Sequence, residues 1–225
     1  MFGAPHPVIA SASRFLPLPR RPLDAAGASG QVRRWYENEL VWPTVPGDPL
    51  RLAVGVRYDV LDVPAEAGHA ALRRLAPGSP VALHGDRMLL LVAAGSAEEL
   101  PGLLEWLDWG SLPLDLGAIG AGGLMEAPSP PVPREEEGEG NTSLRVASPP
   151  PGRPGRAGSQ GAAVWLRPPE PGCEVEASLP MLSALGGGGG APDLVRLVNT
   201  VATQCHRVRL RRAGAQPPAS RAQGR

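Results

Sequence analysis

Lysine is absent from this 225-residue chain, and all 22 of its basic residues are arginine. Without lysine the chain can form no Schiff base and has no lysine to act as a general base. The phosphate-binding loop of Walker-type nucleotide sites also needs a lysine. The glycine run at residues 186–190 is therefore interpreted as a linker, and enzyme classes that depend on lysine are excluded.

Cysteine and long apolar runs are scarce as well. Cys173 and Cys205 are the only thiols, and neither lies in a CxxC pair or beside a spaced histidine pair, which excludes a zinc site of the usual spacing. No stretch approaches the roughly 18 apolar residues of a membrane-spanning helix, and residues 1–22 lack the features of a signal peptide. We therefore expect a cytoplasmic protein without a membrane partner.

Aromatic residues make up only 4% of the chain, whereas its 29 glycines and 28 prolines amount to a quarter of it. Such a composition does not pack along its whole length, so we expect one modest domain interrupted by disorder. The predicted segments are a disordered leader (1–30), a core (31–127), a disordered Pro/Gly/Glu-rich insert (128–161), a strand and helix that complete the domain (162–212), and a basic disordered tail (213–225).

Hydrophobic periodicity within these boundaries predicts an α+β fold. Helices are predicted over residues 31–40, 64–75, 96–110 and 193–212, and strands over 57–63, 81–83, 88–93, 114–116, 124–127 and 163–166. Ser96-Ala97-Glu98-Glu99 has the capping-box pattern of a helix start. The four residues from His84 to Arg87 suit a hairpin turn between two of the strands.

Carboxylates near strand ends are the first candidates for chemistry. Asp59 and Asp62 belong to one predicted strand, and Asp115 follows the helix that begins at Ser96. Two strand-borne carboxylates can hold Mg²⁺ for phosphoryl transfer. An aspartate beside a turn can instead cap a backbone N–H, and spacing alone leaves both interpretations open.

Charge is distributed unevenly although the formal net charge is zero. An acidic cluster lies at residues 135–139, and residues 206–225 carry six arginines and no acid. The arginines of the predicted final helix are candidates for nucleic-acid contact: Arg207, Arg209, Arg211 and Arg212. The alternative is a solvated basic tail without a ligand.

Several phrases of the sequence resemble a known family. They are Trp35-Tyr36, Val41-Trp42-Pro43-Thr44-Val45-Pro46, Leu61-Asp62-Val63-Pro64, Gly85-Asp86-Arg87-Met88-Leu89-Leu90-Leu91, Leu114-Asp115-Leu116 and Gly122-Gly123-Leu124-Met125-Glu126-Ala127-Pro128-Ser129. In this order they resemble the N-terminal domain of bacterial bifunctional DNA primase/polymerases, the prim-pol branch of the archaeo-eukaryotic primase superfamily. The resemblance covers residues 31–131 and implies a small RRM-related mixed sheet with flanking helices.

The resemblance also assigns roles to residues. It implies that Asp62 and Asp115 are the remnants of a catalytic, Mg²⁺-binding acid set, and that Arg87 and His84 lie where a nucleotide would bind. The sequence departs from the family pattern at three positions, with Val41 in place of glycine, Pro64 in place of the second acid and Met88 in place of a histidine. Asp59 is not expected to replace the missing acid, because strand alternation puts it on the face opposite Asp62. His84 precedes the position of that histidine by four residues.

Three hypotheses about function follow. The first is a shortened prim-pol-like domain with lost or reduced nucleotidyl transfer, which binds a nucleotide, DNA or a replication-associated protein. The second is an active primase/polymerase that uses Asp62, Asp115 and a Mg²⁺ cofactor. The third is a protein-interaction scaffold that acts through the insert. A cofactor belongs only to the second hypothesis.

Overall fold

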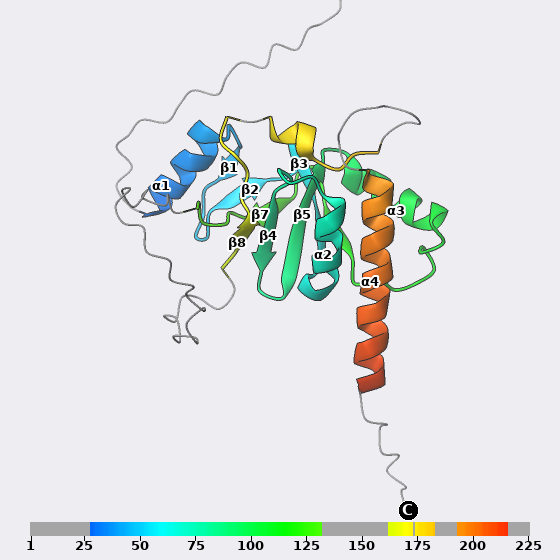
Figure 1. The fold of residues 1–225 in the computed structure, drawn as a ribbon. Helices are drawn as coiled ribbons and strands as arrows, with labels where there is room; N and C mark the ends of the chain where they lie inside the picture. Colours follow the sequence, from blue (N-terminus) through cyan, green and yellow to red (C-terminus); the bar gives the residue numbers. More distant parts are fainter. Residues whose placement is uncertain (1–27, 132–161, 173, 183–192, 216–225) are drawn as a thin grey trace, which may run out of the picture.

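The computed structural model describes residues 28–131, 162–172, 174–182 and 193–215 of the chain (Figure 1). Its helical elements are α1 (Ala28–Arg34) with a π-helical turn (Trp35–Glu39), α2 (Ala65–Ala71) with a 3-10 turn (Leu72–Arg74), α3 (Ser96–Trp106), a 3-10 turn (Val175–Ser178) and α4 (Leu194–Ala215). Its strands are β1 (Thr44–Val45), β2 (Arg51–Ala53), β3 (Tyr58–Pro64), β4 (Val81–His84), β5 (Arg87–Ala93), β6 (Gly117–Ile119), β7 (Leu124–Glu126) and β8 (Val164–Arg167). The predicted α+β class is confirmed.

The strands form two sheets whose ladders are all antiparallel, rather than the single mixed sheet that the resemblance implies. The larger sheet has the order β6-β3-β5-β4-β8, and the smaller has the order β1-β2-β7. β2, only three residues long, is not predicted by periodicity, and it exists because it pairs with both β1 and β7. Such short strands are stabilised by their partners rather than by their own sequence.

Side-chain alternation along the larger sheet separates two cores. On one face, Leu61 and Val63 of β3 pack with α2, α3 and α4, which lie together on the same side of the sheet in Figure 1. On the other face, Val60 packs with α1, the smaller sheet and the segment that carries β8. The central strand β3 is therefore buried on both sides, and its register fixes which residues reach which face.

The helical layer depends on α4, which follows the insert in sequence. Six of its side chains are buried against the helical face of the sheet: Leu194, Leu197, Val198, Val201, Cys205 and Val208. α2 lies against both α4 and the sheet, and a Cβ atom at Gly68 would come within 2.4 Å of the Sδ atom of Met88. The absence of a side chain at Gly68 thus lets α2 approach the strand on which Met88 is buried.

The opposite core is aromatic, and it joins the two ends of the domain. The hydroxyl of Tyr36 donates to the carbonyl of Pro128 at 2.6 Å and accepts the indole N–H of Trp165 at 2.9 Å. Trp42 lies between Tyr36 and Tyr58, with ring centroids 6.1 and 4.6 Å away. Burial raises the pKa of Tyr36, so this hydroxyl stays protonated and keeps the strand after the insert attached to the N-terminal helix.

Two predicted local features are wrong. The predicted strand at 114–116 is a loop, and the strand begins at Gly117, where pairing with β3 becomes available. The capping box at Ser96 makes no cap: Gly95, with φ +91°, precedes the helix, and Oδ2 of Asp59 accepts the N–H of Ala97 at 2.9 Å. In both cases a contact with β3 overrides the local sequence pattern.

Some predicted boundaries also shift. The hairpin turn between β4 and β5 has two residues rather than four, because His84 and Arg87 are paired. α1 includes residues 28–30 of the predicted leader, Ser129 of the predicted insert forms a bridge with Val164, and α4 continues to Ala215. The predictions for 1–27, 132–161 and 216–225, and that of a glycine linker at 186–190, lie outside the described residues. Within the described part of the chain, no helix has the length and apolar character needed to cross a bilayer.

Candidate functional site

Strand register and the loop before β6 bring Asp62, Arg87 and Asp115 together at the end of the larger sheet. Asp62 of β3 is paired with Gly117 of β6, and Asp115 precedes Gly117 by two residues. Arg87 opens β5 opposite Pro64, which lies two residues after Asp62. Since residues two apart on a strand share a face, Asp62 and Arg87 start from the same side of the sheet, and the loop before β6 brings Asp115 next to them.

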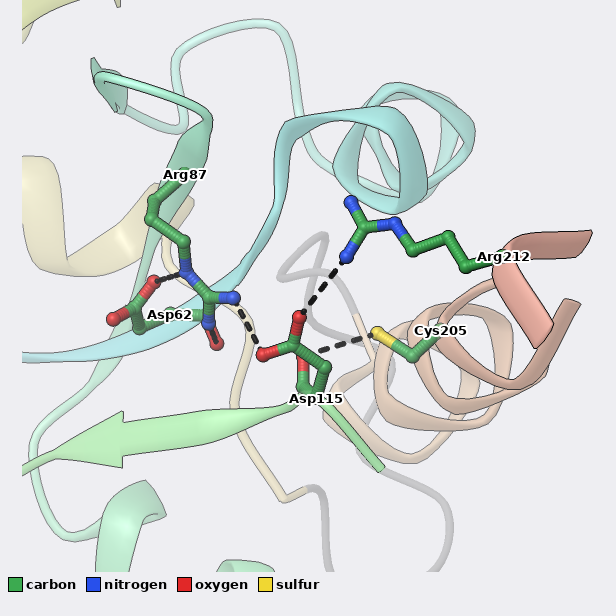
Figure 2. A network of polar contacts seen from close by, with 5 residues as sticks. All are labelled: Asp62, Arg87, Asp115, Cys205 and Arg212. Carbon is green, nitrogen blue, oxygen red and sulfur yellow. Dashed lines mark hydrogen bonds and ion pairs between the residues drawn. The ribbon is translucent and has the colours of Figure 1, made fainter. Parts of the chain in front are cut away.

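Arg87 lies between the two carboxylates and donates to both (Figure 2). Its Nε–H donates to Oδ1 of Asp62 at 2.7 Å, and its Nη1–H donates to Oδ1 of Asp115 at 2.6 Å. Its Nη2–H donates to the backbone carbonyl of Asp62 at 2.9 Å. One planar guanidinium thus joins β3, β5 and the loop before β6.

Electrostatics reinforce this geometry. Burial would lower the pKa of Arg87, but the hydrogen bonds to Asp62 and Asp115 and their negative charges outweigh it, so the pKa is raised above its ordinary value. The Arg87 side chain is only 25% exposed, and both acids are more exposed than that. A second arginine, Arg212 of α4, lies 3.8 Å from Oδ2 of Asp115. Two acids and two arginines leave the cluster neutral.

Helix α4 fixes the loop that carries Asp115. The thiol of Cys205 donates to the backbone carbonyl of Asp115 at 3.5 Å, and Arg209 donates to the carbonyl of Pro113. At the start of the loop, Trp109 donates from Nε1 to Oδ1 of Asn199 at 3.0 Å. These contacts place Asp115 from the helical side while Arg87 holds it from the strand side.

A pocket opens beside Asp115, between the loop and α4. Its volume is about 290 Å³, and it is lined by Pro113, Leu114, Asp115, Cys205, Val208, Arg209 and Arg212. Burial raises the pKa of the Cys205 thiol to about 11, and the charge of Asp115 adds to this increase while that of Arg87 opposes it. The thiol is therefore neutral near pH 7 and is not an activated nucleophile.

The other residues suggested by the sequence lie elsewhere. Nε2 of His84 is 3.6 Å from Oε2 of Glu126, and His84 makes no hydrogen bond or ion pair with the Asp62 cluster among the described residues. Asp59 points to the helical face, as its spacing from Asp62 predicts, and caps α3. Met88 is fully buried in the helical core, so position 88 faces away from Asp62 and Asp115.

The C-terminal arginines lie on α4, as the predicted final helix places them. Arg209 and Arg212 contact the loop before β6, and Arg211 forms an ion pair with Glu66 of α2 at 2.7 Å. Arg207 is exposed and has no ion-pair partner within the described ranges. Sequence reasoning missed Arg212 and Cys205 as neighbours of Asp115, because no spacing pattern relates a loop to a helix some 90 residues away.

The donor set does not fit a Mg²⁺ ion. Magnesium sites need carboxylate oxygens with free lone pairs and an excess of negative charge. Here both carboxylates accept from Arg87, and the charges of the cluster are already balanced. In the described part of the chain, no group of three or more His, Cys, Asp or Glu side chains is placed to hold a metal ion.

Comparison with protein-family models, with curated proteins and with solved structures found no match for this chain.

Proposed function

We propose that this chain is a prim-pol-like domain that no longer transfers nucleotides and that acts by binding a nucleotide, nucleic acid or a replication-associated protein. The observation that carries the proposal is the guanidinium of Arg87 between Asp62 and Asp115. In a metal-dependent polymerase, carboxylates at such positions would share divalent ions. A protein cation occupies that place here, and it cannot bridge an incoming triphosphate as Mg²⁺ does.

Two neighbouring positions support the loss of catalysis. The residue that the resemblance pairs with Asp62 is Pro64, which has no ligand atom and pairs with Arg87 across the sheet. The position that the resemblance gives to a phosphate-contacting histidine is Met88, buried against Gly68. A change of rotamer cannot restore either function. Pro64 has no atom that could bind a metal ion, and Met88 lies on the face of the sheet opposite Asp62.

The backbone at Val41 supports the resemblance itself. Val41 has φ +57°, in the left-handed region that favours glycine and is unusual for a β-branched residue. The resembled family has glycine at this position. The turn that follows α1 therefore has the conformation that the family's residue would suit, even though this chain carries valine there.

The experiment is template-dependent nucleotide incorporation with Mg²⁺ or Mn²⁺. The chain and a folded Asp62→Ala, Asp115→Ala double variant are compared on the same primed and unprimed templates. We expect no incorporation above background from either protein. Incorporation by the unmodified chain that disappears in the double variant would overturn the proposal and establish the active primase/polymerase alternative.

Nucleic-acid contact is the binding mode that a specific observation favours. α4 carries four exposed arginines in its C-terminal half and no acid along its length. Three of them have partners in the domain, so Arg207 is the arginine most available to a phosphate. If α4 binds DNA, affinity for a fluorescent single strand falls as salt rises and is weaker in Arg207→Gln than in Arg74→Gln, an exposed arginine of the 3-10 turn after α2.

Affinity that is independent of salt, or equal loss in the two variants, would contradict this binding mode. The scaffold hypothesis would then gain, and its segment, residues 128–161, lies mostly outside the described residues.

A further inference from the structure

An apolar groove runs along α3, at a distance from the Asp62 cluster. Its volume is about 460 Å³, and it is lined by Glu99, Gly102, Leu103, Trp106, Leu182 and Val195. The four α3 residues of this set are spaced i, i+3, i+4 and i+7, so they form one continuous face of the helix. Trp106 ends this face and is 72% exposed. A tryptophan so exposed beside an apolar groove is typical of an interaction surface.

One glutamate, Glu99, lines this groove, and two more lie on the same helix next to that face. Glu98, Glu99 and Glu105 lie on α3, and α3 carries no basic residue. None of the three forms an ion pair with any described residue. The groove thus combines an apolar floor with free negative charge, which selects an apolar anchor flanked by arginine or lysine.

The end of α4 has the complementary character. Residues 209–215 are all exposed, and α4 extends past the rest of the domain in Figure 1. Leu210 is 58% exposed and lies three residues after Arg207, so the two side chains share a face of the helix. Arg207, as described above, has no acidic partner in the described ranges. We define Arg207 and Leu210, with Ala213, Gly214 and Ala215 at the end of the helix, as the α4 tip.

We propose that the α4 tip of one copy of this chain binds the α3 groove of a second copy. Leu210 enters the apolar groove beside Trp106, and Arg207 faces the free glutamates of its rim. The chain has zero formal net charge, so no overall repulsion opposes this contact between a positive and a negative end. The proposal does not depend on the loss of catalysis, because it uses neither Asp62, Arg87 nor Asp115. It does use Arg207, so self-association and the nucleic-acid contact proposed above compete for this one side chain.

The partner must be another copy rather than the same molecule. Val195, in the first turn of α4, lines the groove, and Leu210 lies 15 residues further along the same helix. At about 1.5 Å per residue the two are separated by roughly 22 Å of rigid helix. One copy therefore cannot place its own tip in its own groove, and the contact is heterologous: each copy offers a groove at one end and a tip at the other.

Two other occupants fit the surfaces less well. A two-fold dimer of α3 grooves would bring the free glutamates of both copies together, which like charges oppose. A phosphate backbone could be attracted to the tip, but the acidic groove would repel it. Self-association therefore needs the α3 groove, whereas binding of nucleic acid to the tip does not.

Sedimentation velocity of the full chain, treated with nuclease, tests the proposal. At low salt we expect the average mass to rise above 23.4 kDa as concentration increases, and to fall back when salt is added. Trp106→Ala removes the aromatic side chain that lines the groove. Leu210→Glu replaces the apolar side chain of the tip with a negative charge. Each variant alone is expected to associate at least about 30-fold more weakly than the unmodified chain, the loss typical of a central aromatic anchor.

Mixing the two variants gives the decisive result. Trp106→Ala keeps its tip and Leu210→Glu keeps its groove, so an equimolar mixture should form a complex that stops at two copies. Val164→Ala, an exposed position on the opposite edge strand β8, is the control and should associate like the unmodified chain. A chain that is monomeric at every concentration, association unchanged by Trp106→Ala, or a mixture that does not recover would each overturn the proposal.

Discussion

Arg87 shows how a single residue can decide what an acid pair does. Asp62 and Asp115 are brought together by the β3–β6 register, and two carboxylates this close would repel each other or attract a cation. Arg87 supplies that cation from within the chain and binds both side chains. The fixed fork of a guanidinium suits this task, since it donates in two directions without losing its charge.

Removing Arg87 should therefore create affinity for metal. In Arg87→Ala the two carboxylates lose their internal cation, so we expect Mn²⁺ or Mg²⁺ to raise the melting temperature of the variant but not of the unmodified chain. Without metal the variant should be less stable by about 1–2 kcal/mol, because charge-assisted hydrogen bonds are lost. Thermal unfolding with and without Mn²⁺ measures both effects.

Arg196→Ala is the matched control, since Arg196 is highly exposed and pairs with Asp193 at 3.6 Å. It should change stability by less than about 0.5 kcal/mol and gain no metal response. Stabilisation of the unmodified chain by Mn²⁺ that depends on Asp62 would show that Arg87 yields to a metal, against this prediction.

Val41 is a second residue for which the backbone conformation predicts the effect of a substitution on stability. Its φ of +57° costs a β-branched side chain more than it costs glycine, and its side chain is partly exposed. Val41→Gly should therefore raise the free energy of unfolding by about 1 kcal/mol. Urea unfolding measures the change.

The control is Val56→Gly, at an exposed valine outside the left-handed region. It should instead lower the free energy of unfolding by about 0.5–1 kcal/mol. Equal effects at both positions would contradict the assignment of strain to Val41.

At the scale of the elements, the start of α3 shows where local patterns fail. Ser96 to Glu99 has the sequence of a capping box, yet no side chain of this segment caps the helix. Asp59, buried on β3, accepts the N–H of Ala97 instead. The helix therefore begins where the sheet supplies a carboxylate, and its N-terminus is tied to the central strand.

Asp59→Ala should destabilise the domain by about 1–2 kcal/mol, the usual cost of losing a helix cap. Asp59→Asn keeps an oxygen for the same hydrogen bond and should cost less than the alanine variant. Chemical unfolding followed by circular dichroism compares the two. Equal losses would mean that the negative charge of Asp59, rather than its hydrogen bond to Ala97, stabilises the start of α3.

These elements also show how much the sequence could predict. α2, α3, α4 and the β4–β5 hairpin have strong apolar periodicity, and the structure confirms them. β2 and β6, three residues each, are defined by partners distant in sequence, so no local pattern shows them. The acid pair and Arg87 were each predicted as site residues, Arg87 for a nucleotide. The pairing of Arg87 with both carboxylates was not predicted, because the register that aims its side chain between them exists only in the folded sheet.

At the scale of the whole molecule, both cores are completed by residues that follow the insert. Trp165 of β8 joins the aromatic core, and α4 supplies six side chains to the helical core. The bridge between Ser129 and Val164 brings the two sides of the insert together in space. The domain is therefore one folding unit that the 30 residues at 132–161 interrupt in sequence without separating its parts.

This continuity gives two opposite outcomes for two deletions. Replacing residues 132–161 by about eight Gly and Ser residues should preserve the fold and raise stability by about 1 kcal/mol, because a shorter loop costs less entropy to close. Ending the chain at residue 131 removes β8 and α4, exposes both cores and should abolish cooperative unfolding. Urea titrations followed by tryptophan fluorescence compare the two proteins. A cooperative transition in the 1–131 fragment would show that residues 1–131 fold without β8 and α4. Loss of the fold in the loop-shortened chain would show that residues 132–161 are needed for it.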